Sequence, residues 1–266
     1  MKKILSLVLA VLMLTASVAL LASCKKDENV LIMATEPSFP PYEFVGDDGN
    51  YAGIDVEIAQ LIAEKLGMTL KIEAVEFGSI IGGVQSGKYD MGMAGMTVTP
   101  ERLESVNFTT SYANGVQVVI VNENSEYADL NDFFVLDDAG NWTAVKEGVK
   151  IGVQQDTTGD IYASSKVEDF GFGEENVVRY KTSADAVQAL KTGKVTAVII
   201  DVDPAKSYVS VNEGLKIMPT EYANEDYAIC IAKENTELLE KINKALAELK
   251  ADGTLDKIVE KYIPAK

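Results

Sequence analysis

Two segments of this chain follow the same pattern, and that pattern constrains the fold more than any other feature. Residues 79–97, "SIIGGVQSGKYDMGMAGMT", and residues 183–201, "SADAVQALKTGKVTAVIID", each contain a short helical stretch with Val-Gln, a Ser/Thr-Gly-Lys stop and an apolar strand. Helices and strands alternate along the chain with short connections, which predicts an α/β fold with parallel sheets. Ligands of such sheets bind beyond the carboxyl ends of the strands.

Polar residues at the ends of the predicted strands are therefore the first candidates for a binding site. They follow four separate apolar runs, and they are Glu36, Gly95 with Thr97, Gln154 to Gly159, and Asp201. We expect these side chains to point to one place. A change of domain is predicted near 112–116, and the closing helices at 234–252 and 254–262 are expected to belong to the opening domain.

The junction 94–102, "AGMTVTPER", has the chemistry of an anion site. Thr99 can cap a helix that starts at Pro100, Gly95 allows close approach to the backbone, and Arg102 offers a fork of donors that suits a carboxylate. Taken alone, the motif also fits an ordinary helix start with a solvated surface arginine. Other motifs of the chain are needed to choose between these two interpretations.

The N-terminus has the pattern of an export signal. Two lysines precede an uncharged run at 4–20, and Leu-Ala-Ser-Cys follows at 21–24. The last four residues resemble the bacterial lipobox, which predicts a signal peptide at 1–23, a lipid on Cys24, a tether at 24–29 and attachment to the outer face of the cell membrane. The run of 17 residues is at the short limit for a spanning helix, which is the alternative.

Composition excludes several classes of function. Removal of residues 1–23 leaves 22 basic and 41 acidic residues, a formal charge of −19, so nucleic acid is a poor partner. The chain has no histidine and, besides Cys24, only Cys230, which excludes His-based catalytic pairs, His-based zinc sites and cysteine clusters. We therefore expect no metal, no cofactor and no enzymatic activity.

Seven motifs, in order, are similar to those of the extracellular solute-binding proteins of polar amino acid ABC transporters, family 3. They are "ATEPSFPPYEF" (34–44), "GIDVEIAQLIAEKLG" (53–67), "FGSIIGGVQSGKYDMGMAGMTVTPER" (77–102), "VNFTTSYA" (106–113), "IGVQQDTTGD" (151–160), "AVIIDVDPA" (197–205) and "LKADGTLDKIVEKYI" (249–263). The resemblance covers nearly all of the chain after the signal peptide.

The resemblance implies a type II periplasmic-binding-protein fold with two α/β lobes that close on a ligand. Each lobe would have a mostly parallel sheet flanked by helices. The expected boundaries are 30–112 with 226–266 for the first lobe, 117–221 for the second, and 113–116 with 222–225 for a two-strand hinge. The implied partners are a free L-amino acid and the permease subunits of an ABC importer, and the implied state is a monomer.

The resemblance also implies roles for individual residues. Arg102 would pair with the ligand α-carboxylate, with help from the backbone N–H groups of Thr97 and Thr158. Asp201 would take the α-ammonium, together with the Thr97 hydroxyl and the carbonyl of Ala94 or Gly95. Phe39 and Phe77 would sandwich the ligand side chain, and Gln154 lies in a matching motif. A buried zwitterion needs both charges met, which agrees with this arrangement.

Acidic residues near these positions favour a ligand with a cationic side chain, such as arginine, lysine, ornithine or histidine. Glu36 stands where the family often has aspartate, and Glu43, Glu76 and Asp156 are near ligand positions in sequence. Asp156 departs from the family, because many relatives carry glycine or a small residue there. The alternative is that these carboxylates are exposed charges and that the ligand is glutamine or cystine.

Two other classes of function remain as alternatives. A small branch of the family resembles dehydratases that act on arogenate-like compounds, and here only Glu36, Glu43 or a lysine could supply the acid-base group. A sensory module is the other alternative. Such modules are normally fused to a spanning helix and a kinase, so the transporter fits this sequence better.

Overall fold

The computed structural model describes residues 29–264, which include nearly all of the compact unit Leu31–Lys266. The predicted signal peptide, Cys24 and most of the predicted tether lie outside the described residues. Among the described helices, none is long and apolar enough to cross a membrane.

The first sheet has five strands in the order β5 (Thr69–Ala74), β1 (Val30–Thr35), β6 (Met91–Gly92), β15 (Cys230–Ala232) and β7 (Val106–Phe108). Strand β1 is parallel to β6, and β15 is antiparallel to β6 and β7. Alternation along β1 divides its buried residues between two cores, because Leu31 and Met33 pack in one cluster and Ala34 packs in another.

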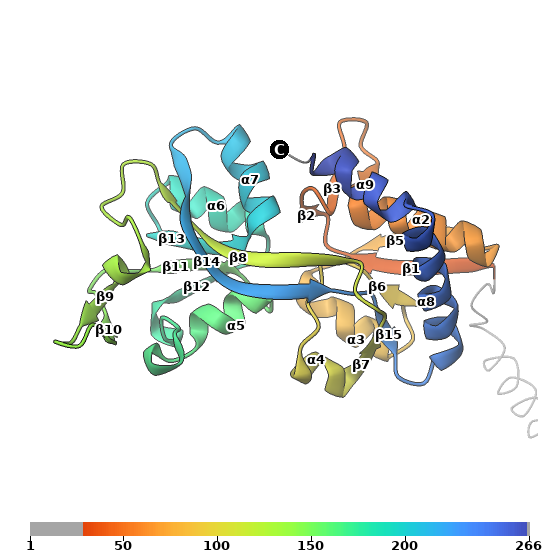
Figure 1. The fold of residues 1–266 in the computed structure, drawn as a ribbon, viewed down its shortest axis with the longest axis horizontal. Coiled ribbons are helices and arrows are strands. Elements are labelled where there is room, and N and C mark those ends of the chain that lie inside the picture. Colours follow the sequence, from red (N-terminus) through yellow and green to blue (C-terminus); the bar gives the residue numbers. More distant parts are fainter. Residues whose placement is uncertain (1–28, 265–266) are drawn as a thin grey trace, which may run out of the picture. The chain divides into compact units, whose positions relative to one another are not determined.

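Five helices accompany this sheet (Figure 1). They are α2 (Ile54–Leu66), α3 (Ile80–Gln85), α4 (Pro100–Ser105), α8 (Thr236–Ala251) and α9 (Thr254–Tyr262). The core that contains Leu31 also contains buried residues of α2, α8 and α9, whereas Ile80 and Val84 of α3 lie in the core that contains Ala34. The closing helices therefore pack with the opening strands.

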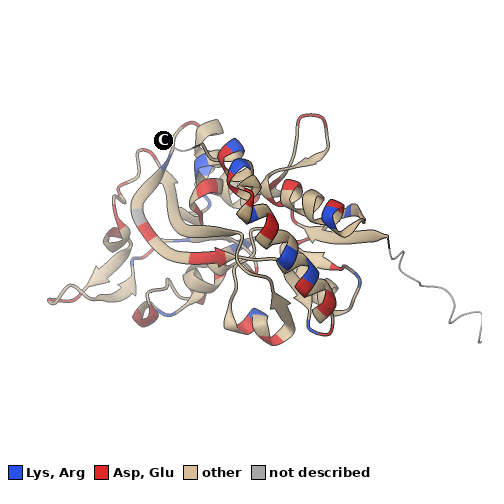
Figure 2. Ribbon diagram, turned by 45° about the vertical axis from the view of Figure 1, so that its right-hand side comes forward, with Lys and Arg blue, Asp and Glu red and all other residues tan. Residues whose placement is uncertain are grey.

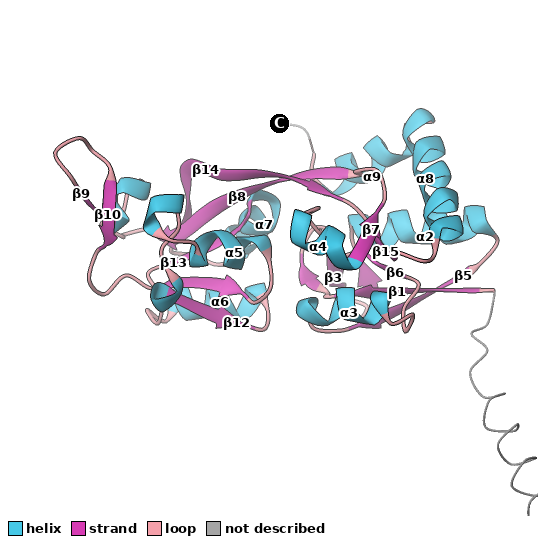
Figure 3. Ribbon diagram, turned by 90° about the horizontal axis from the view of Figure 1, so that it is seen from below, coloured by secondary structure: helices cyan, strands magenta, loops and turns pink. Residues whose placement is uncertain are grey.

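The second sheet has the order β12 (Val177–Tyr180), β11 (Ile151–Gln154), β13 (Ala197–Asp201), β8 (Ala113–Asn122) and β14 (Leu215–Tyr227). Strands β12 and β13 are parallel to β11, whereas β8 is antiparallel to both β13 and β14. The helices α5 (Thr158–Ser164), α6 (Ser183–Lys191) and α7 (Val202–Val211) accompany it, and the hairpin β9 (Phe134–Leu136) with β10 (Trp142–Val145) projects from it (Figures 1 and 3).

Strands β8 and β14 form a long antiparallel ribbon that runs from the second sheet towards β6 and β15 (Figure 1). Tyr227 pairs with Ala113 at one end of the ribbon, and Leu215 pairs with Asn122 at the other. The segments expected to act as the hinge, 113–116 and 222–225, lie in these two strands. The expected α/β fold class is confirmed, and both sheets are mixed because antiparallel strands join the parallel pairs.

Capping residues define the ends of two helices, and the predicted Thr99 cap is one of them. Gly67 ends α2 in the left-handed conformation, and Thr99 caps α4 by accepting the backbone N–H of Arg102 at 3.2 Å. At the start of α2 the N-cap residue is Gly53, and Asp55 two residues later is completely buried and does not cap the helix. The Asp55 carboxylate instead accepts hydrogen bonds from the Gly95 N–H and the Tyr112 hydroxyl.

A short three-stranded sheet lies between β1 and α2 in sequence. It consists of β2 (Ser38–Phe39), β3 (Glu43–Val45) and β4 (Tyr51–Ala52), all antiparallel. Acidic residues are spread over the helices and loops around both five-stranded sheets, and basic residues are fewer there (Figure 2). The buried acidic residues are the exceptions that define the site.

Candidate functional site

Every residue that the sequence predicts for ligand binding lines one cavity of about 310 Å³. Its lining combines segments that accompany the first sheet with segments that accompany the second. The first group is Glu36, Phe39, Glu43, Phe77, Ala94, Gly95, Thr97 and Arg102, and the second is Gln154, Thr157, Thr158 and Asp201. Whether these residues hold a ligand stays a prediction, but the structure does bring them together.

Arg102 is buried, with 7% of its surface exposed, so the interpretation as a solvated surface arginine is wrong. Its guanidinium donates from Nη1 to the carbonyl of Thr97 at 2.8 Å and from Nη2 to the carbonyl of Asp156 at 3.1 Å. It also lies 5.2 Å from the centre of the Phe77 ring. Burial lowers the pKa of Arg102, although a guanidinium stays charged at any physiological pH.

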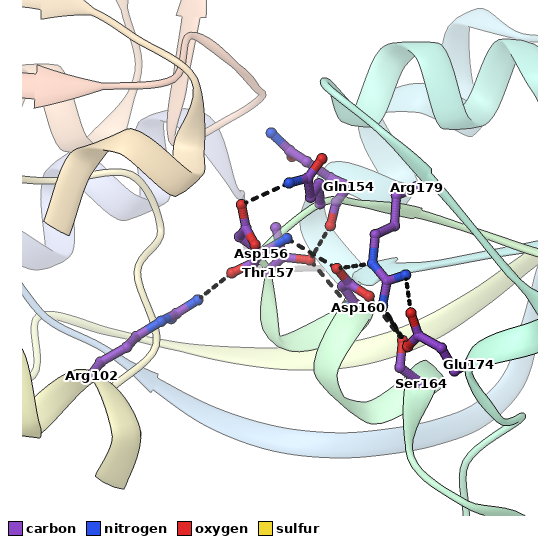
Figure 4. A network of polar contacts seen from close by, with 9 residues as sticks. Arg102, Gln154, Asp156, Thr157, Asp160, Ser164, Glu174 and Arg179 are labelled. Carbon is purple, nitrogen blue, oxygen red and sulfur yellow. Dashed lines mark hydrogen bonds and ion pairs between the residues drawn. The ribbon is translucent and has the colours of Figure 1, made fainter. Parts of the chain in front are cut away.

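Asp156 and Glu76 do not line the cavity. Asp156 has a left-handed backbone with φ of 65°, and its N–H donates to Asp160 Oδ2 at 3.1 Å (Figure 4). A Cβ on Gly78 would lie 2.1 Å from Asp156 Oδ2, so the Asp156 carboxylate packs directly against this glycine. Glu76 is exposed and forms an ion pair of 2.6 Å with Lys181. Both carboxylates therefore lie outside the predicted ligand position.

Glu36 is buried at the end of β1 and faces the second sheet. Its Oε2 accepts hydrogen bonds from Ser38 Oγ at 2.7 Å and from Gln154 Nε2 at 2.9 Å. Gln154 Oε1 in turn accepts from Ser183 Oγ at 2.6 Å. Burial raises the pKa of Glu36 in spite of these hydrogen bonds. The alternative that Glu36 is an exposed charge is therefore wrong.

Glu43 and Asp55 form a buried acidic pair beside the cavity. Asp55 Oδ2 accepts from the Gly95 N–H and from the Tyr112 hydroxyl, each at 2.9 Å, and burial raises its pKa to about 6. Glu43 is 1% exposed, and burial followed by the charge of Asp55 raises its pKa well above the usual range. Glu43 Oε2 has no hydrogen-bond partner within the described part of the chain.

Asp201 ends β13 and lies at the back of the cavity. One oxygen accepts from Gln117 Nε2 at 2.8 Å and the other accepts from the Tyr227 hydroxyl. Burial, and then the charge of Glu225, raise the pKa of Asp201 well above its ordinary value. Glu225 is also buried, and its Oε2 accepts from Thr97 Oγ1 at 2.9 Å and from Gln117 Nε2 at 3.1 Å.

The aromatic wall of the cavity depends on a glycine. Gly95 has φ of 51°, and a Cβ there would lie 2.7 Å from Phe39 Cε1. The glycine therefore lets the Phe39 ring and the backbone after β6 meet closely. Phe77 lies at the start of the 3₁₀ turn Phe77–Ser79, and both rings line the cavity.

Sequence reasoning missed two polar residues of this region. Gln117 and Glu225 lie on the paired strands β8 and β14. Glu225 could have been found from the sequence, because it alternates with the apolar residues Tyr227 and Ile229, and alternate residues of a strand share one face. All three residues are buried in the structure. Gln117 had no such signal.

The arrangement can receive a small molecule that carries charges of both signs. It offers one guanidinium, several buried carboxylates and two aromatic rings, and the carboxylates are neutralised by no ion pair within the described residues. The search of these residues found no cluster of three or more His, Cys, Asp or Glu residues arranged to hold a metal. A cation supplied by a ligand would therefore meet unpaired carboxylates here.

Comparison with known proteins agrees with this geometry. Residues 31–265 match the model of the bacterial extracellular solute-binding proteins, family 3. The chain is similar to ABC transporter arginine-binding protein 1 of Escherichia coli, at 30% identity over 97% of this chain and 98% of that protein. Two solved structures of an ancestral arginine-binding protein are also similar. The structure bound to arginine has 38% identity and a TM-score of 0.77, and the match covers 89% of this chain and 99% of that chain. The structure bound to glutamine has 36% identity and a TM-score of 0.77, and the match covers 90% of this chain and 100% of that chain.

Proposed function

This chain belongs to the bacterial extracellular solute-binding proteins of family 3, and we propose that it captures a free amino acid with a cationic side chain, L-arginine first, for an ABC importer. The family consists of binding proteins rather than enzymes. The similar Escherichia coli protein and the ancestral protein that binds arginine support the choice of ligand.

One observation carries the proposal. A single cavity holds the buried Arg102 and the buried Asp201, which are contributed by segments of different sheets. A zwitterion would satisfy both, with its α-carboxylate on Arg102 and its α-ammonium on Asp201, helped by Thr97, Thr158 and the carbonyl of Ala94 or Gly95. Only the closed arrangement meets both charges, so binding would favour closure.

The acidic residues on the side of β1 and β3 support a cationic side chain. Glu36 and Glu43 line the same cavity, and no described cation pairs with either carboxylate. A guanidinium between the rings of Phe39 and Phe77 would reach a carboxylate and supply the missing positive charge. Glutamine, which the second ancestral complex contains, is the neutral alternative.

Closure would bring together the two lobes whose expected boundaries are 30–112 with 226–266 and 117–221, through bending at 113–116 and 222–225. Contacts that join them in this structure include the bond from Arg102 Nη2 to the Asp156 carbonyl and the bond from the Tyr208 hydroxyl to the Ser38 carbonyl at 2.5 Å. The closed monomer would then present its ligand to the permease subunits of the importer.

We propose that the protein is held on the outer face of the cell membrane by a lipid on Cys24, after removal of residues 1–23. Mass spectrometry of the protein extracted from membranes would show an N-terminal diacylglyceryl cysteine. Cys24→Ser should release the protein from the membrane fraction, and a variant that remained fully membrane-bound would argue for a spanning helix instead.

The experiment that tests the ligand uses residues 25–266, refolded to remove any carried-over ligand. The melting temperature is measured with each of the twenty amino acids and with ornithine, citrulline and cystine. A ligand at 100 times its dissociation constant stabilises the folded state by about 2.7 kcal/mol, which gives a clear shift. We expect the largest shift with arginine.

Each outcome selects one function. A shift with basic amino acids alone supports the proposal, whereas a shift with glutamine or cystine would keep the binding site and remove the role of Glu36. No shift with any compound would reopen the dehydratase-like alternative, which turnover of prephenate or arogenate would then test.

A further inference from the structure

Two buried carboxylates of the site share one hydrogen-bond donor. Gln117 Nε2 lies 2.8 Å from Asp201 Oδ2 and 3.1 Å from Glu225 Oε2. The amide nitrogen therefore brackets two acidic oxygens that come from different strands, β13 and β14. Glu225 Oε1 is buried and has no hydrogen-bond partner in the described residues.

We propose that Glu225 is a second carboxylate of the ammonium site, and that Asp201 and Glu225 hold one proton between them until the ligand ammonium replaces it. The inference rests on the proposed function and names a regulation of the same site. Binding would then release one proton to solvent. The pair would carry a net charge of −1 with its proton, and the same net charge once it is fully ionised and holds an ammonium.

Burial is the reason why the pair needs a proton. Asp201 is 8% exposed and Glu225 is 6% exposed, and two ionised carboxylates at this depth repel each other with little help from water. Burial and the neighbouring Glu225 both raise the pKa of Asp201, in agreement with a retained proton.

The groups that face the pair from the surrounding elements do not remove the need for the proton. Arg102 carries the positive charge of this neighbourhood, but its guanidinium donates hydrogen bonds to the backbone carbonyls of Thr97 and Asp156 rather than to either carboxylate. The other titratable groups around the pair bring no positive charge. They are three phenols, Tyr42 before β3, Tyr162 on α5 and Tyr227 on β14, and one carboxyl group, Glu43 on β3.

Glu225 also orients the hydroxyl that is expected to meet the ammonium. Thr97 Oγ1 donates its single proton to Glu225 Oε2 at 2.9 Å, so the Thr97 oxygen can only accept from its other neighbours. Thr158 Oγ1, at 3.4 Å, uses one of its two lone pairs, and the other is free to accept. An ammonium is a donor only, so an accepting hydroxyl is the orientation that it requires. Glu225 is in this respect a positioning residue, since it acts on the ligand through Thr97 as well as through charge.

Isothermal titration calorimetry with L-arginine at pH 6, 7 and 8, in pairs of buffers with different ionisation enthalpies, counts the protons released. We expect the wild type to release protons and its affinity to rise with pH, by up to tenfold per pH unit for one proton. In Glu225→Gln the release should fall by up to one proton per ligand and the pH dependence should flatten. Glu221→Gln, an exposed glutamate on the same strand, is the matched control and should behave as wild type.

A ligand probe keeps the test decisive if Glu225→Gln folds poorly. The 2-hydroxy analogue of arginine has no ammonium, so it should release fewer protons from the wild-type protein than arginine does. Binding of arginine without proton release, or with equal release in wild type and Glu225→Gln, would overturn this inference and leave the proposed function intact. Failure of arginine and all other amino acids to bind would overturn the proposed function itself.

Discussion

Two acidic regions of this protein are neutralised in opposite ways. Outside the cavity, the buried Asp160 forms an ion pair of 2.8 Å with Arg179, and Arg179 also pairs with Glu174 at 2.6 Å (Figure 4). In the cavity and directly beside it, no ion pair within the described residues reaches Glu36, Glu43, Asp55, Asp201 or Glu225. The first region has its cation built in, whereas the second is left to receive one.

The difference separates stability from binding. A buried carboxylate that is paired with a protein cation completes the fold, and loss of its partner leaves an uncompensated charge. A buried carboxylate without a cation costs folding free energy until a proton or a ligand neutralises it. Variants in the two regions should therefore have opposite signatures, and the following predictions test that contrast.

The largest expected effect is on binding. Arg102→Ala and Asp201→Ala should each weaken arginine binding by at least about 2 kcal/mol, a rise in Kd of about 30-fold or more, because each leaves one end of the zwitterion unpaired. Calorimetric titration measures this. Asp138→Ala, in the exposed turn between β9 and β10, is the control, and an unchanged Kd in either site variant would remove the assigned role.

The buried acids inside the cavity should make the free protein less stable as the pH rises. Asp55 has a pKa of about 6 in the folded protein against an ordinary 3.8, so the folded state holds more protons in this interval. Stability should therefore fall between pH 4 and 6, by a contribution on the order of 3 kcal/mol from Asp55.

Asp55→Asn removes this titration but keeps an oxygen for the Gly95 N–H and the Tyr112 hydroxyl. Melting temperatures at pH 4, 5, 6 and 7 should then fall less steeply than in wild type. The exposed Asp47→Asn should leave the profile unchanged. If the slopes of Asp55→Asn and wild type coincide, Asp55 is not a source of the pH dependence.

The contrast also explains how much could be predicted from sequence. The positions of Glu36, Gln154 and Asp201 follow from strand ends, because parallel strands bring their carboxyl ends to one edge whatever the details of packing. Arg102 follows from the Thr99-Pro100 helix start. These are local signals, and the structure places all four residues at one cavity.

The remaining part of the site depends on contacts between distant segments. Asp55 has the sequence of a helix cap, yet it is buried by Gly95 and Tyr112, which are 40 and 57 residues away. The pairing of Asp160 with Arg179 and the left-handed backbone of Asp156 are likewise set by tertiary structure. Sequence alone therefore could not tell which carboxylates have a protein cation beside them.

A smaller effect is expected in the region that has its own cation. Arg179→Met should lower the free energy of unfolding by about 2 kcal/mol, because Asp160 is buried and would lose its ion pair, while Ser164 would also lose a hydrogen bond. Arginine affinity of the folded variant should stay within about threefold of wild type. A large loss of affinity at unchanged stability would place Arg179 in the binding site and erase the contrast between the two regions.

The smallest effect should discriminate between ligands rather than abolish binding. Glu36→Gln keeps an oxygen that Ser38 and Gln154 can use, and it removes only the negative charge, so arginine should bind about tenfold more weakly while citrulline binds as before. Glu76→Gln is the matched control, because Glu76 already has Lys181 as its partner. Competition of both ligands against labelled arginine measures the ratio. Equal losses for arginine and citrulline would mean that Glu36 positions Gln154 and does not receive the ligand cation, which would leave Glu43 as the carboxylate available for that charge.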